Sequence, residues 1–173
     1  MIQRPHLQTA IPSLFCLLAL VSMAGCGQPS DRSLETAFNE HESDLNKLVE
    51  MADRDSKFST IAPRFAIADK IDEAPEKALG EQRWMAYESL FDAAGVSDGL
   101  RRDPHHPGAI FFVASIKGVL TGESQKGYVY SELPLTPTVD SLDRTLPPSV
   151  SPGPDGLFAF KPLKKNWYLF YYE

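Results

Sequence analysis

An apolar run near the amino terminus most constrains how this chain folds, because it divides the sequence into two parts of different character. Residues 11–24 carry no charge, and the segment before them has one basic residue, Arg4, and no acidic residue. This run is shorter than the ~20 residues that a helix needs to cross the hydrocarbon layer. A basic start, a short apolar core and small residues at its end are typical of an export signal. We therefore expect residues 1–25 to be removed and residues 26–173 to fold.

The segment closes on Met23, Ala24, Gly25 and Cys26. A small pair before a cysteine resembles the bacterial lipoprotein signal, although Met23 departs from that pattern, in which Leu is commonest. The resemblance implies that Cys26 carries a diacylglycerol and anchors the protein in the lipid bilayer of the cell envelope. Because Gly27 follows instead of Asp, it also implies the periplasmic face of the outer membrane if the bacterium is Gram-negative. The alternative is an ordinary secretory signal cut after Ala24, which leaves an exported protein with a free cysteine.

Cysteine content and charge limit the remaining part of the chain. The chain has two cysteines, Cys16 and Cys26, so the exported part can form no internal disulfide and depends on its apolar core. Its length suits one domain. Without Arg4, 16 basic residues face 23 acidic residues. This acidic balance disfavours nucleic acid as a partner, so we expect none, and it favours a basic partner.

Two helices are expected. Ser33 suits the N-cap of a first helix that continues to about Arg54, and Pro75 and Gly95 suit the start and the end of a second helix. Apolar residues at steps of three and four mark the inner face of the first helix: Leu34, Phe38, Leu45, Leu48 and Ala52. We expect residues 26–33 to form the lipidated tether and residues 34–173 to form one domain.

The strands follow from shorter patterns. Residues 57–69 indicate a short strand pair near an edge, residues 109–117 a central strand, residues 127–130 its antiparallel neighbour, and residues 157–172 a closing hairpin. The segment 133–154 contains six prolines, and we expect a surface excursion with one helical turn near residues 140–143. The expected fold is α+β, with two helices on one face of a four- or five-stranded, mainly antiparallel sheet.

One dense polar stretch, residues 101–107, lies in the loop that we expect before the central strand, and it contains the weak metal-ligand or general-base candidates His105 and His106. Adjacent side chains of an extended segment point to opposite sides, which makes it difficult for these two to share one ion. The chain has no Gly-x-Ser-x-Gly, Gly-rich phosphate-binding or His-Glu-x-x-His motif. We therefore expect no cofactor and no catalytic residue.

Aromatic residues are the remaining candidates for a binding role. Trp84 and Tyr87 lie on the inner face of the second helix, where a ligand pocket and core packing are both open interpretations. The same alternatives hold for three aromatic residues of the strands, Tyr128, Tyr130 and Trp167.

Three functions fit these observations. The preferred one is a non-catalytic, membrane-tethered lipoprotein that presents a binding surface to another envelope or periplasmic protein. The second is a lipoprotein that carries a small ligand between Trp84, Tyr87 and the sheet. The third is a metal-dependent hydrolase that uses His105 and His106.

Overall fold

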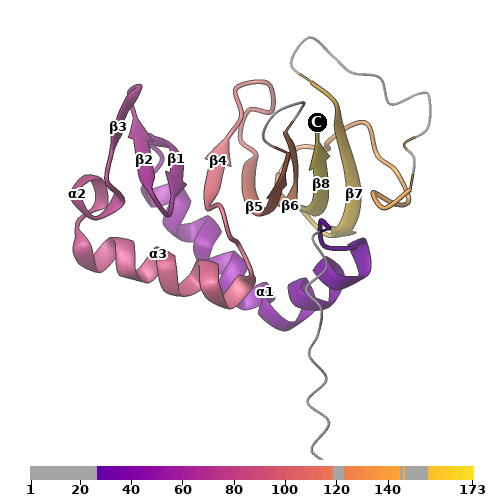
Figure 1. Cartoon of the computed structure of the whole chain (residues 1–173), viewed down its shortest axis with the longest axis horizontal. Helices are drawn as coiled ribbons and strands as arrows, with labels where there is room; N and C mark the ends of the chain where they lie inside the picture. The colour runs from indigo at the N-terminus through magenta and orange to yellow at the C-terminus, as the bar shows by residue number, and fades with distance from the viewer. Residues whose placement is uncertain (1–26, 119–122, 145, 147–155) are drawn as a thin grey trace, which may run out of the picture.

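The computed structural model describes residues 27–118, 123–144, 146 and 156–173. The predicted export signal, Cys26 and residues 147–154 of the proline-rich segment lie outside the described residues. Figure 1 shows helices on one side of a single open sheet, which confirms the α+β class.

Helix α1 spans Asp31–Arg54 and ends where the sequence predicts. The prediction of Ser33 as its N-cap is wrong, because Ser30 occupies that position and its Oγ accepts a hydrogen bond from the Ser33 N–H at 3.1 Å. The helix thus starts inside the segment that we expected to be a tether. At His41 the backbone leaves the helical region, with φ −121° and ψ 19°, and the helix is kinked there.

The second predicted helix is divided in two. Helix α2 spans Pro75–Leu79, and helix α3 spans Glu81–Ala94. Gly80 separates them at a φ of 86°, a conformation that other residues rarely adopt. As predicted, Pro75 starts the first of these helices, and Gly95 ends the second in the left-handed conformation.

All strand pairs of the sheet are antiparallel, in the order β3-β2-β1-β4-β5-β6-β8-β7. The strands are β1 (Phe58–Ala62), β2 (Phe65–Ala68), β3 (Ile71–Glu73), β4 (Leu100–Arg102), β5 (Ile110–Lys117), β6 (Ser124–Tyr130), β7 (Phe158–Lys164) and β8 (Trp167–Tyr172).

The prediction of four or five strands is wrong, because the described residues form eight. Strands β3 and β4 have three residues each and carry charged side chains, so neither shows the alternation that identifies a strand. Backbone pairing with longer neighbours fixes both of them. Arg101 and Arg102, which the sequence placed in a loop, are therefore strand residues.

The two faces of the sheet have separate cores. Phe112 pairs with Tyr128 on the side of the helices, whereas the preceding residue, Phe111, pairs with Val129 on the opposite side. We call the two clusters the helix-side core and the far-side core. The helix-side core includes the apolar faces of α1 and α3, and the far-side core includes Phe160 and Phe170 of the last hairpin.

The described part of the proline-rich segment runs along the outer edge of β7. Leu135 is buried in the far-side core, Thr138 forms a parallel bridge with Phe160, and Leu142 is buried in the helix-side core. Residues 140 and 142–144 form bends and residue 141 has no regular structure, so the predicted helical turn near residues 140–143 is wrong. No helix of the described ranges has both the length and the apolar character of a membrane span.

Candidate functional site

Most aromatic residues that the sequence suggested for binding are packed in the helix-side core. Trp84, Tyr87, Tyr128 and Trp167 belong to that core, and none of them exposes more than 9% of its surface. Tyr130 is half-buried at the margin of the same core. Among these five candidates, only Tyr130 presents substantial surface to a partner.

The polar end of Tyr87 is also engaged within the protein. Its hydroxyl donates to Asp55 Oδ2 at 2.9 Å, and Arg83 Nε donates to the same oxygen at 2.8 Å. Burial raises the pKa of Tyr87, and the hydrogen bond to Asp55 raises it further. These contacts join α3 to the end of α1, and a ligand between Trp84, Tyr87 and the sheet stays a prediction.

The two adjacent histidines have different surroundings. His106 packs against Phe158 and Phe160, with ring centroids 4.7 and 5.3 Å away, and its Nδ1 lies 3.6 Å from Asp103 Oδ2. His105 is exposed, and its backbone N–H donates to Asp103 Oδ1 at 2.8 Å. The described residues contain no group of three or more His, Cys, Asp or Glu that could hold a metal ion.

Polar groups of Gln28 and Asp31 bind the start of the described chain to strand β6 and to Asp143 of the proline-rich segment. Gln28 Nε2 donates to the Ser124 carbonyl oxygen at 3.0 Å, and the N–H of Asp31 donates to Asp143 Oδ2 at 2.9 Å. Lys126 Nζ lies 2.8 Å from Asp31 Oδ1 and 2.6 Å from Asp143 Oδ1. Asp143 therefore neutralises Lys126 and also satisfies a free N–H in the first turn of α1.

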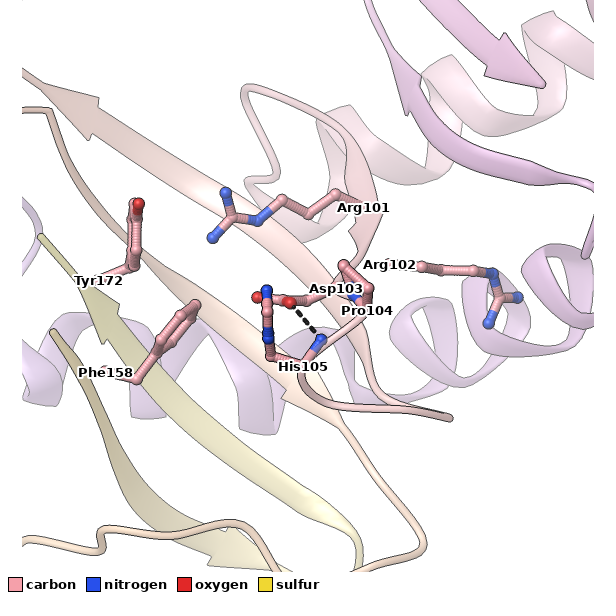
Figure 2. A pocket seen from close by; sticks show the side chains of 7 residues that line it. All are labelled: Arg101, Arg102, Asp103, Pro104, His105, Phe158 and Tyr172. Atoms are coloured by element: carbon pink, nitrogen blue, oxygen red, sulfur yellow. Dashed lines mark hydrogen bonds between the residues drawn. The ribbon is translucent and has the colours of Figure 1, made fainter. Parts of the chain in front are cut away.

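A pocket of about 280 Å³ lies above the far-side core (Figure 2). It extends from β4 and the turn after it to Phe158 of β7 and Tyr172 of β8. Its lining residues are Arg101, Arg102, Asp103, Pro104, His105, Phe158 and Tyr172. We call it the Arg101 pocket.

The two arginines of β4 extend in different directions (Figure 2). Arg102 turns toward α1, where its Nη2 donates to the Ala52 carbonyl oxygen at 2.9 Å. The Arg101 guanidinium lies over two aromatic rings, 5.1 Å from the centroid of Tyr172 and 5.7 Å from that of Phe111. Burial lowers the pKa of Arg101, although an arginine in a protein keeps its charge at neutral pH.

A second recess, of about 330 Å³, lies on the other side of the 103–108 turn and includes Tyr130. Asp53 and Glu132 contribute carboxylates, and Leu133 exposes 60% of its surface. The rings of Tyr130 and Trp167 pack in a T-shaped arrangement with their centroids 5.3 Å apart. The Tyr130 hydroxyl accepts a hydrogen bond from Asn166 Nδ2 at 3.4 Å. We call the group formed by Asp53, Tyr130, Glu132 and Leu133 the Tyr130 surface.

The sequence predicted one candidate site residue in each place. Tyr130 belongs to the Tyr130 surface, and His105 lines the Arg101 pocket. The sequence singled out Arg101 only as part of a loop, and it gave Lys126 no role. Lys126 lies between Gln125 and Gly127, a local sequence that gives no signal of a buried ion pair, and its partners come from distant parts of the chain.

No family model, no curated protein and no solved structure matches this chain. The chemistry of its own side chains therefore carries the functional argument.

Proposed function

We propose that a lipid on Cys26 holds this protein at the bacterial cell envelope, and that the Tyr130 surface binds a basic envelope or periplasmic protein. The role is one of binding and not of catalysis. The export and lipidation pattern of residues 1–26 supports the location, and the excess of acidic over basic residues supports the charge of the partner.

The position of Gln28 supports a close attachment to the bilayer. Its side chain is bound to β6 only two residues after Cys26. Two extended residues span at most about 7 Å. A lipid on Cys26 would therefore keep the folded domain against the membrane surface and give it little freedom to move away.

The single observation that supports a protein partner most strongly is the exposed side chain of Leu133 beside Tyr130. Tyrosine and apolar side chains are favoured at the centre of protein interfaces, and charged groups around them select the partner and its orientation. Here the recess itself contains two carboxylates, Asp53 and Glu132, and Asp53 also lies 3.6 Å from the Arg102 guanidinium at its margin. This combination suits a basic protein with an apolar contact residue.

Mass spectrometry of the native protein tests the anchor. We expect residues 1–25 to be absent and Cys26 to carry a diacylglycerol. A Cys26→Ser variant should no longer fractionate with membranes. A native protein with an unmodified Cys26, or with residues 1–25 still attached, would contradict the proposal.

Site-specific photo-crosslinking in cells tests the partner. A photoreactive residue at Leu133 should give a discrete adduct with a basic protein, and high salt or the Asp53→Asn, Glu132→Gln pair should weaken it. The matched control is Met85, an apolar residue of similar exposure on α3. The same adduct from both positions, no adduct from Leu133, or an adduct insensitive to charge would count against this surface.

A further inference from the structure

We propose that the Arg101 pocket binds a small organic monocarboxylate with a flat apolar body, because it holds a guanidinium whose buried Nε and Nη2 have no hydrogen-bond partner among the described residues. This site goes beyond the proposed function, and it depends neither on the lipid nor on the Tyr130 surface.

The first argument is that two nitrogens of the Arg101 guanidinium lack hydrogen-bond partners among the described residues. Arg101 Nε and Nη2 are both buried, and neither has a hydrogen-bond partner among the described residues. Leaving a buried donor unsatisfied costs about 1–3 kcal/mol, and more when the group is charged. A carboxylate accepts two parallel hydrogen bonds from one edge of a guanidinium and would satisfy both groups.

The other half-buried arginines of the described chain, Arg83 and Arg102, do have partners for their guanidinium groups. Arg83 pairs with Asp55 at 2.8 Å and donates to the Met51 carbonyl oxygen. Arg102 donates to a carbonyl and lies 3.6 Å from Asp53, and of its buried nitrogens Nε lacks a partner in the part of the chain that the structure describes. Among the described residues Arg101 makes no such direct ion pair, and the carboxylates of Asp103 and Glu123 attract it only from a greater distance, so that burial still lowers its pKa.

The second argument is that the cation is already held in place. The Arg101 guanidinium packs over the rings of Tyr172 and Phe111. Cation–π contacts of this kind limit the motion of the guanidinium and leave its N–H groups available for hydrogen bonds. A ligand oxygen therefore displaces no protein hydrogen bond from Nε or Nη2. A site held ready in this way loses less entropy on binding.

The third argument concerns the body and the charge of the ligand. Phe158 and Tyr172, with ring centroids 4.7 Å apart, form an apolar wall beside Arg101. A volume of about 280 Å³ lies at the small end of ligand pockets. The carboxylate of Asp103, held by the His105 N–H, lines the same pocket and disfavours a doubly charged anion such as phosphate.

Isothermal titration calorimetry and ¹⁵N NMR of the purified protein with benzoate test this site. We expect one benzoate to bind and to shift the Arg101 Nε–H resonance. Benzamide, which has the same shape without the charge, should bind at least about tenfold more weakly, as the loss of a charge-assisted contact predicts. Inorganic phosphate should also bind more weakly than benzoate, because the Asp103 carboxylate repels a doubly charged anion.

Variants locate the binding. Arg101→Met should weaken benzoate binding about tenfold or more, whereas Arg64→Met, which removes an exposed arginine, should leave it unchanged. The thermal midpoint of Arg101→Met should equal or exceed that of the parent, because a buried unpaired charge is removed. If Arg101→Met fails to fold, Arg101→Lys replaces it and should bind benzoate more weakly than the parent.

Three results would overturn the proposal. They are no binding of benzoate at tens of millimolar, equal binding of benzoate and benzamide, and undiminished binding by a folded variant at Arg101.

Discussion

Replacement of Lys126 by methionine tests the ionic contacts at the start of α1. The Lys126 residue is 2% exposed, and its Nζ lies between the carboxylates of Asp31 and Asp143. Methionine keeps most of the aliphatic stem and removes the charge. The change therefore isolates the ammonium group from the packing of the side chain.

The expected loss can be worked out from the surroundings of the two carboxylates. Removing one member of a buried ion pair costs about 3–5 kcal/mol, because a charge is left buried without its partner. Lys161 Nζ still lies 3.4 Å from Asp31, and the Asp143 side chain is 40% exposed to water. Both features reduce the cost, so we expect about 3 kcal/mol, which corresponds to about 6–12 °C in the thermal midpoint of a chain of this size.

Thermal and urea unfolding, followed by circular dichroism, measure this loss. The matched control is Lys165→Met, which removes an exposed lysine and should change stability by no more than about 0.5 kcal/mol. Equal midpoints for the Lys126 and Lys165 variants would refute the reasoning, because they would show that the buried ammonium adds nothing to the stability of the fold.

Lys126→Met should also change how the free energy of unfolding depends on pH. Burial by itself raises the pKa of Asp31, but the Lys126 ammonium and the Leu142 N–H outweigh it, so the pKa is lowered from 3.8. A lowered pKa contributes stability above the unfolded value, and this contribution disappears as the pH falls through the folded value. Without Lys126 the folded-state pKa of Asp31 rises, so Lys126→Met should lose less unfolding free energy than the parent as the pH falls from 7 to 3. Identical profiles of unfolding free energy between pH 7 and pH 3 would contradict this assignment.

Three further outcomes follow from buried contacts. Tyr87→Phe removes a hydrogen bond to the Asp55 carboxylate and should lower the unfolding free energy by about 2 kcal/mol in urea titrations; an unchanged value would contradict it. Gly127→Ala places a Cβ against a backbone carbonyl of β5 and should cost about 3 kcal/mol or prevent folding, whereas Gly27→Ala, in open space, should be neutral in thermal melts. Burial raises the pKa of Tyr128 to about 12, so its tyrosinate absorbance should appear well above that of exposed tyrosines, and its stabilising effect, complete below pH 10, should fade as the pH rises toward 12.

Local patterns in the sequence were sufficient for the longer elements. The apolar spacing from Leu34 to Ala52 predicted most of α1, and the limits set by Pro75 and Gly95 are those of α2 and α3. The apolar run at Ile110 predicted the central strand β5, and the last hairpin was also confirmed. These signals work because each element must repeat its apolar residues at its own period in order to bury one face.

Short elements and polar partners depended on the tertiary structure. Strands β3 and β4 are too short to show a period, and only pairing with β2, β1 and β5 makes them strands. The sequence placed Arg101 in a polar stretch, but only the folded sheet sets its guanidinium beside Tyr172, 71 positions away, and leaves its buried N–H groups without a partner among the described residues.

The sequence by itself determined the α+β class and the acidic character of this protein, and it predicted an export signal that stays a prediction. The tertiary structure decided which aromatic residues are packed, which of them reaches the surface, and where a buried charge is paired. The physical reason is one of distance along the chain. Periodicity and charge can be read from neighbouring residues, whereas the partner of a buried polar group, such as Asp31 for Lys126, comes from a segment that only folding brings close.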